Sequence, residues 1–157
     1  MRQMIYALAL CFLGTASSAC PDYNLWGRDV YIASAYELYT PRSLNVVAGG
    51  DFNLASCNTQ ARNWSGPMPG WAHSAPDFTI TITELFGYQL EFRVESNCDS
   101  VMLINTSVGN WYFDDDTNGN RDPLIRLSRP AGDGVYDIWI GTYDGSQCDA
   151  RLIMETF

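Results

Sequence analysis

Apolar and polar residues alternate along much of this chain with the two-residue period of a β-strand. In the segment 78–83, Phe78, Ile80 and Ile82 fall on one face and three threonines fall on the other. The segment 88–95 repeats the arrangement, with apolar residues on one face and charged residues on the opposite face. No stretch of convincing length has the helical period, so the pattern predicts a mainly β protein.

Further strands are expected at 30–39, 43–54, 100–104, 111–113, 124–127, 135–143 and 150–155. Many short strands with turns between them are typical of an antiparallel β-sandwich. The segment 43–54 is expected to fold back as a hairpin at Ala48–Asp51, because its glycines can take positive φ. No linker or internal repeat divides the chain, which predicts a single domain.

The segment 63–76 interrupts this alternation with three prolines and two tryptophans, and we expect it to be a long loop. Trp64, Trp71 and His73 are candidates for a ligand-binding groove, since loops carry function and aromatic faces bind sugars and peptides. The alternative, which we favour, is that these rings cover one open end of the sandwich.

The first 19 residues have the composition of a secretory signal peptide. Arg2 precedes an apolar stretch at 4–13, and small residues then lead to a cleavage site after Ala19. The apolar stretch is shorter than the roughly 20 residues of a membrane span. We therefore expect a periplasmic or secreted protein. Lipid attachment at Cys20 is the less favoured alternative, because Ser17 stands where such sites usually have a leucine-like residue.

The chain is acidic, with nine basic and 18 acidic residues, no lysine and a formal charge of −9 at pH 7. The predicted signal peptide contains one of the arginines and no acid, so its removal leaves residues 20–157 with a charge of −9 − 1 = −10. A domain of this charge repels polyanions, which excludes nucleic acid as a partner. The same field attracts dissolved cations.

Removal of the signal peptide leaves four cysteines, Cys20, Cys57, Cys98 and Cys148. An even number of cysteines in an exported chain indicates disulfides. Three pairings are possible, and we predict Cys20 with Cys57 and Cys98 with Cys148, because each pair brackets one half of the chain. A zinc site is disfavoured, since the cysteines are not closely spaced and the chain has a single histidine.

The run from Asp114 to Asp122 places oxygen-bearing side chains at alternate positions around Gly119. Counted from Asp114, positions three, five and nine are Asp116, Asn118 and Asp122. This matches the opening of the DxDxNG calcium loop, in which the chain curls around the ion and a glycine permits the sharp turn. Because hard oxygen ligands favour Ca²⁺ over soft metals, the run predicts a calcium site.

The match to a calcium loop is partial. Position twelve is Ile125 where the helical loop has a glutamate, and Pro123 argues against a following helix, so the turn is expected to be mounted on strands. The alternative is a hairpin turn at Asn118-Gly119 whose acidic neighbours are solvated. Three adjacent aspartates repel one another in an ion-free turn, which is the argument for a cation.

The sequence shows no convincing catalytic constellation. His73 is the only histidine, no GxSxG motif is present, and four bridged cysteines leave no thiol nucleophile. A pair of carboxylates acting on a glycoside stays open, because their separation in space decides that chemistry. We expect a protein that is not an enzyme.

Four segments, 90–94, 99–103, 113–116 and 134–140, follow in an order that resembles the bacterial pre-peptidase C-terminal domain. In that family a strand pair leads to an acidic, glycine-rich turn and then to a G-x-Y-x-x-x-V strand and a final Y-x-L-x-V strand. The resemblance covers about 78–156 and departs from the family at Ala150, where an aromatic residue is usual.

This resemblance implies a jelly-roll-like sandwich that is not itself proteolytic, in a family whose relatives bind calcium or extracellular polymers. We therefore expect an exported, all-β, antiparallel jelly-roll-like β-sandwich with two disulfides and a structural Ca²⁺ ion. It is expected to bind an extracellular or periplasmic protein or glycan. The alternatives are a carbohydrate- or peptide-binding protein that uses the 63–76 segment, or a small secreted hydrolase.

Overall fold

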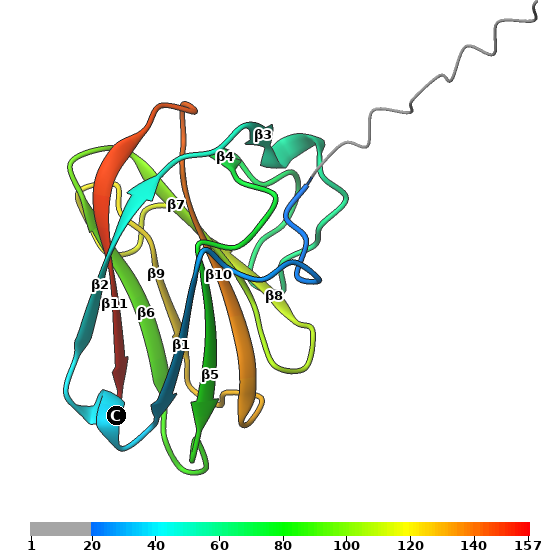
Figure 1. The fold of residues 1–157 in the computed structure, drawn as a ribbon. Coiled ribbons are helices and arrows are strands. Elements are labelled where there is room, and N and C mark those ends of the chain that lie inside the picture. Colours follow the sequence, from blue (N-terminus) through cyan, green and yellow to red (C-terminus); the bar gives the residue numbers. More distant parts are fainter. Residues whose placement is uncertain (1–19) are drawn as a thin grey trace, which may run out of the picture.

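The structure is a computed structural model that describes residues 20–157, and the predicted signal peptide lies outside the described residues. Two β-sheets pack face to face in a sandwich (Figure 1). The helical structure in the described range consists of two single-turn 3-10 helices, η1 (Glu37–Tyr39) and η2 (Leu54–Ser56). None of the described helices is long and apolar enough to cross a membrane. The predicted all-β sandwich is confirmed.

One sheet has seven strands, and we call it the seven-stranded sheet. Its strands are β1 (Asp29–Ser34), β3 (Phe52–Asn53), β4 (Trp71–Ala72), β5 (Phe78–Thr83), β7 (Ser100–Asn105), β8 (Trp111–Asp114) and β10 (Gly134–Thr142). The order is β1-β5-β10-β4-β3, and β7 pairs with β10 and β8. The long central strand β10 therefore organises this sheet.

The other sheet has four strands in the order β2-β11-β6-β9, and we call it the four-stranded sheet. Its strands are β2 (Arg42–Ala48), β6 (Leu90–Ser96), β9 (Leu124–Leu127) and β11 (Cys148–Thr156). All of its pairs are antiparallel. In the seven-stranded sheet one pair departs from the predicted antiparallel arrangement, because β1 runs parallel to β5.

The predicted hairpin at Ala48–Asp51 is wrong. The strand before it, β2, pairs with β11 in the four-stranded sheet, whereas β3 after it pairs with β4 in the seven-stranded sheet. The glycines instead carry the chain from one sheet to the other. Gly50 has φ +153°, and a Cβ there would lie 1.9 Å from the carbonyl carbon of Ala72, so the crossing requires glycine.

The main core lies between the two sheets. The predicted inward residues of β5, Phe78, Ile80 and Ile82, are fully buried, as are Leu90 and its two apolar neighbours on the same face of β6. A second cluster lies on the outer face of the seven-stranded sheet, under the 54–72 segment. This sheet is thus covered on both faces over part of its length, and there the alternation of apolar and polar residues disappears.

Two disulfides close the fold, and they join the predicted partners. Cys20 is bonded to Cys57, which ties the start of the domain to the end of η2. Cys98 is bonded to Cys148, which ties the β6–β7 turn to the start of β11.

Strand β1 forms one free edge of the seven-stranded sheet. The N–H groups of Asp29 and Ala35 donate to the carbonyls of Asp77 and Thr83, so alternate residues of β1 face β5 and the N–H of Ser34 faces outward. The carboxylate of Glu37 accepts this outward N–H at 2.8 Å.

Candidate functional site

The predicted calcium turn, residues 114–122, is a compact turn between β8 and β9. The N–H of Asn118 donates to the carbonyl of Asp122, and the N–H of Asp122 donates to the carbonyl of Gly119, both at 2.9 Å. Gly119, Asn120 and Arg121 all have positive φ. The backbone of the turn therefore closes on itself through its own hydrogen bonds.

The predicted oxygen ligands of this turn bind different parts of the protein. Asp114 accepts hydrogen bonds from the N–H and hydroxyl of Thr117 and from the N–H of Leu124, at 2.7–3.0 Å. The side-chain amide of Asn118 donates to the carbonyl of Val94 at 2.6 Å. The side chain of Asp116 is exposed.

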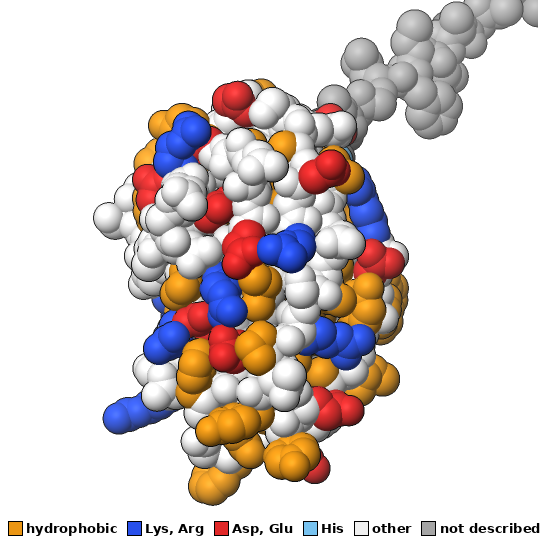
Figure 2. Space-filling model, turned by 90° about the vertical axis from the view of Figure 1, so that its left-hand side faces the viewer, with side chains coloured by type: hydrophobic (Ala, Val, Ile, Leu, Met, Phe, Trp, Pro, Cys, Tyr) orange, Lys and Arg blue, Asp and Glu red, His pale blue; other side chains and the backbone are white. Residues whose placement is uncertain are grey.

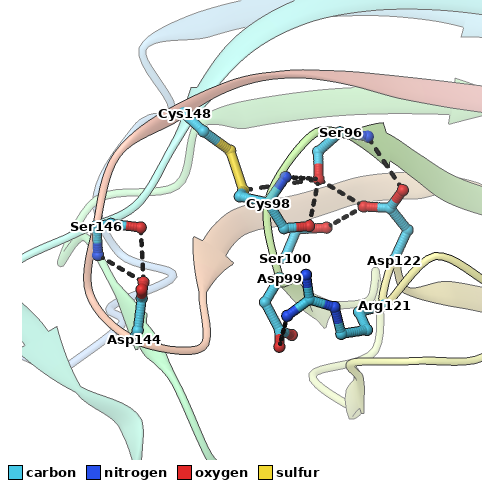
Figure 3. A network of polar contacts seen from close by, with 9 residues as sticks. All are labelled: Ser96, Cys98, Asp99, Ser100, Arg121, Asp122, Asp144, Ser146 and Cys148. Atoms are coloured by element: carbon cyan, nitrogen blue, oxygen red, sulfur yellow. Dashed lines mark hydrogen bonds and ion pairs between the residues drawn. A yellow bond between two sulfur atoms is a disulfide. The ribbon is translucent and has the colours of Figure 1, made fainter.

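Asp122 is buried in a network that Figure 3 shows from close by. Its carboxylate accepts the hydroxyls of Ser96 and Ser100, each at 2.6 Å, and the N–H of Ser96 at 3.1 Å. The neighbouring Cys98–Cys148 disulfide and the ion pair between Arg121 and Asp99 lie in the same region (Figure 3). Asp122 thus fastens the turn to the end of β6 and the start of β7.

These contacts do not converge on one point. No group of three or more histidine, cysteine, aspartate or glutamate side chains in residues 20–157 is placed to hold a metal ion. The pKa of Asp115 is raised, first by burial and then by the charges of Asp116 and Asp114. The second cause means that the carboxylates of the turn repel one another. The calcium site stays a prediction.

The aromatic residues of the 63–76 segment are spread over the covered part of the seven-stranded sheet. Trp64 packs edge-on against Phe113, with ring centroids 4.9 Å apart, and joins the second core cluster. Trp71 belongs to β4 and pairs with Thr142 of β10. The favoured interpretation, that the rings close an open end of the sandwich, is wrong for Trp64, because it covers the outer face of a sheet.

His73 is partly buried, and its pKa is lowered by burial and by the charge of Arg28. The adjacent Ser74 donates its hydroxyl to the carbonyl of Cys20 at 3.3 Å, so that hydroxyl is engaged elsewhere. Neither of the two hollows described next is lined by Trp64, Trp71 or His73. A ligand site at these three residues stays a prediction.

The larger hollow is an open, mainly polar cleft of about 1000 Å³ lined by both sheets and by the acidic turn. Asp77, at its wall, is 2% exposed and accepts one hydrogen bond, from the N–H of Ile140 at 2.8 Å. Its other oxygen has no hydrogen-bond partner and lies 4.0 Å from Nη1 of Arg28. Burial raises the pKa of Asp77 to about 7.

The smaller hollow, of about 390 Å³, lies on the outer face of the seven-stranded sheet, and we call it the outer-face pocket. Strand register places Thr79 of β5 beside Asp137 of β10, and Asp137 beside Asn105 of β7. These three buried polar residues therefore form a row across three adjacent strands. The 23–26 segment and the 106–109 turn complete the lining.

Thr79 connects the wall of this pocket to its floor. Its hydroxyl accepts the N–H of Gly27 at 2.8 Å and donates to Oδ1 of Asp137 at 2.6 Å. A Cβ on Gly27 would lie 2.5 Å from the backbone nitrogen of Thr79, so only glycine allows this approach. Burial raises the pKa of Asp137, and the hydrogen bond from Thr79 opposes that shift.

Asn105 is the unsatisfied member of the row. It is 4% exposed, and its side-chain nitrogen is buried without a hydrogen-bond partner. The sequence offered one signal for this pocket, since Asp137 is the single charged residue of the strand Gly134–Thr142. Its neighbours Thr79 and Asn105 could not be recognised, because the row depends on a register between distant segments.

The chain matches no protein-family model and no curated protein. The resemblance to the pre-peptidase C-terminal domain therefore rests on its sequence motifs. Among solved structures, the chain is similar to the crystal structure of PliG from Aeromonas hydrophila, a periplasmic lysozyme inhibitor of g-type lysozyme. The two are 10% identical with a TM-score of 0.44, over 82% of this chain and 100% of that chain. A likeness of this size does not carry a function from one protein to the other.

Proposed function

We propose that the protein is an exported, non-catalytic binding module that holds its ligand on the outer face of the seven-stranded sheet. The observation that supports this is a gathering of exposed apolar side chains around the outer-face pocket. We call this group the outer-face patch, and its members are Tyr23, Leu25, Trp26, Val30, Ile32 and Val135. Trp26 and Ile32 are 72% and 73% exposed. Contiguous exposed apolar surface marks interaction sites in soluble proteins.

Strand register brings these residues together. Val30 of β1 lies beside Thr79, at the end of the polar row that forms the pocket floor. Ile32 and Val135 lie on either side of Thr81 in the next row. Because alternate residues of a strand share a face, both rows are on the outer side of the sheet.

The outer face of the other sheet has a different character. Figure 2 shows the side of the molecule over this sheet, where basic and acidic side chains lie next to one another. Arg93 forms ion pairs with Glu91 at 2.9 Å and with Glu155 at 2.7 Å. These charges are already paired with one another, whereas the outer-face patch has no cover in the described part of the chain.

The two disulfides support export, because such bonds persist in oxidising compartments. Together with the predicted signal peptide, they support a periplasmic or extracellular location for the proposed binding function.

Arrays of immobilised glycans and peptides test the proposal. We expect the Trp26→Ser variant to bind its array ligands at least about tenfold more weakly than the parent protein, because exposed tryptophans dominate the energy of many interfaces. Phe86→Ser is the matched control: Phe86 is 100% exposed and lies outside the patch, in the β5–β6 turn. Equal loss in both variants, or binding unaffected by Trp26→Ser, would contradict the assignment.

A further inference from the structure

We propose that the outer-face pocket takes a neutral, hydroxyl-rich ligand of the carbohydrate class, with Asn105 and Asp137 as its hydrogen-bonding partners. This inference rests on the proposed function, since it names the ligand class of the same face.

An unpaired amide lies at the floor of the outer-face pocket. Side-chain polar atoms in protein interiors nearly always have a hydrogen-bond partner. The side-chain nitrogen of Asn105 has none in the described residues, although the residue is 4% exposed and lines the pocket. A ligand oxygen that reaches this nitrogen from the pocket would supply the missing acceptor.

The hydrogen bonds beside this amide leave one carboxyl oxygen of Asp137 for a ligand. Oδ1 of Asp137 is held by the hydroxyl of Thr79, whose own acceptor site is used by the N–H of Gly27. The only proton of the Thr79 hydroxyl is thereby given to Asp137. Oδ2 of Asp137, for which residues 20–157 provide no hydrogen bond, is the oxygen left to a ligand. The floor thus presents one amide and one carboxyl oxygen side by side, and a sugar hydroxyl can both donate and accept.

The charges of the residues that line the pocket favour a neutral ligand. No arginine or histidine lines the pocket, and Asp137 is its single carboxyl group. A phosphate or carboxylate ligand would find no cation there and would face an acid. Burial also disfavours the charged form of Asp137, which raises its pKa and makes a cation a weaker match than a neutral ligand. Neutral hydroxyls meet neither obstacle.

Two exposed aromatic rings form part of the pocket rim. The exposed rings of Tyr23 and Trp26 line the pocket, and aromatic rings can pack on the apolar side of a sugar ring. Tyr23 is held by an edge-on contact with Trp111, with ring centroids 6.0 Å apart. The volume of about 390 Å³ lies within the range of small-ligand pockets, about 300–1,000 Å³.

Binding of the purified protein to neutral oligosaccharides, sulfated or carboxylated oligosaccharides and peptides, by array and then by calorimetry, tests this inference. We expect binding to neutral oligosaccharides that falls at least tenfold in Asn105→Leu. The melting temperature of that variant is expected to be unchanged or higher, because the substitution removes an unsatisfied buried amide. Asn45→Leu, the same change at an exposed position of the other sheet, is the control and is expected to bind like the parent.

A second pair of variants separates shape from chemistry at Asp137. Asp137→Asn keeps a hydrogen-bonding group and an acceptor for the Thr79 hydroxyl, so binding is expected within threefold of the parent. Asp137→Leu removes both and is expected to abolish binding.

Three results would overturn the inference. A preference for charged oligosaccharides would refute the ligand class, and a large fall in the melting temperature of Asn105→Leu would show that the amide supports the fold. Peptide binding that is lost in Trp26→Ser and retained in Asn105→Leu would refute the carbohydrate site while leaving the proposed function intact. Absence of binding to every oligosaccharide and peptide would refute both.

Discussion

Asp122 is the buried aspartate of the acidic turn, and its carboxylate binds neighbouring strands. Three donors from Ser96 and Ser100 meet its buried carboxylate, and together they join the turn to the β6–β7 region. Asp99, which lies in the same region (Figure 3), makes instead an ion pair with Arg121, whose side chain is 67% exposed. The same kind of side chain therefore has two different roles, and burial decides which.

Asp122 and Asp99 are expected to contribute differently to the stability of the fold. Asp122→Ala leaves buried hydroxyl and N–H donors without an acceptor and is expected to lower the free energy of unfolding by about 3 kcal/mol. Asp99→Ala removes an exposed pair and is expected to cost less than about 1 kcal/mol. Urea unfolding of both variants measures the difference. Equal losses would show that the Asp122 network contributes nothing beyond a surface contact.

Asp77 is a buried acid whose charged form is disfavoured by the folded protein. Its pKa rises from 3.8 to about 7, first because of burial, while the N–H of Ile140 and the charge of Arg28 act in the opposite direction. Between these two values the folded protein holds a proton that the unfolded chain has released. The resulting stability is present below pH 4 and is lost as the pH rises through about 7.

Asp77→Asn is expected to remove this pH dependence. Because the amide cannot ionise, the variant should gain stability relative to the parent between pH 4 and pH 8, by up to roughly 4 kcal/mol. Denaturant unfolding of the variant and of the parent at pH 4 and at pH 8 gives the difference in their stability at each pH. The assignment fails if the difference between variant and parent is the same at pH 4 as at pH 8.

At the scale of elements, strands were predictable where apolar and polar side chains alternate, although Thr79 and Glu91 on the polar faces of β5 and β6 are buried as well. The alternation in 78–83 identified the inward residues of β5 correctly, and the same holds for β6. The crossing at Gly49–Asp51 was mistaken for a hairpin, because two glycines permit either path and only the pairing partners of β2 and β3 distinguish them. The row of Thr79, Asp137 and Asn105 was invisible for a related reason, since it exists only once distant strands are in register.

The acidic turn between β8 and β9 is expected to respond to calcium. If the turn binds calcium, free Ca²⁺ at about 100 times its dissociation constant raises the free energy of unfolding by roughly 2.7 kcal/mol. Relief of the repulsion among Asp114, Asp115 and Asp116 is the physical reason, and Asp116→Ala is expected to abolish the response. Melting curves recorded with calcium and with a chelator are the test, and identical curves would remove the calcium site.

At the scale of the whole molecule, the sandwich has two unlike outer surfaces. Paired charges cover the four-stranded sheet, whereas the seven-stranded sheet is half covered by the 54–72 segment and half open at the outer-face patch. The Cys20–Cys57 disulfide joins the segment that walls the pocket to the segment that covers the rest of the sheet. The outer-face patch is therefore held by a covalent bond on the side where the chain has little regular structure.

The contact between Glu37 and Ser34 has a consequence for solubility. A free strand edge beside exposed Val30 and Ile32 is a template on which a second molecule can add its own strand. Glu37 occupies the outward N–H at the end of β1, and η1 then turns the chain away, so the last residue of this edge offers no N–H to an added strand. The same hydrogen bond lowers the pKa of Glu37, which keeps this protection in place at mildly acidic pH and lets it fail only in stronger acid. One surface carboxylate thus closes the end of a free strand edge that lies beside the exposed apolar residues of the outer-face patch.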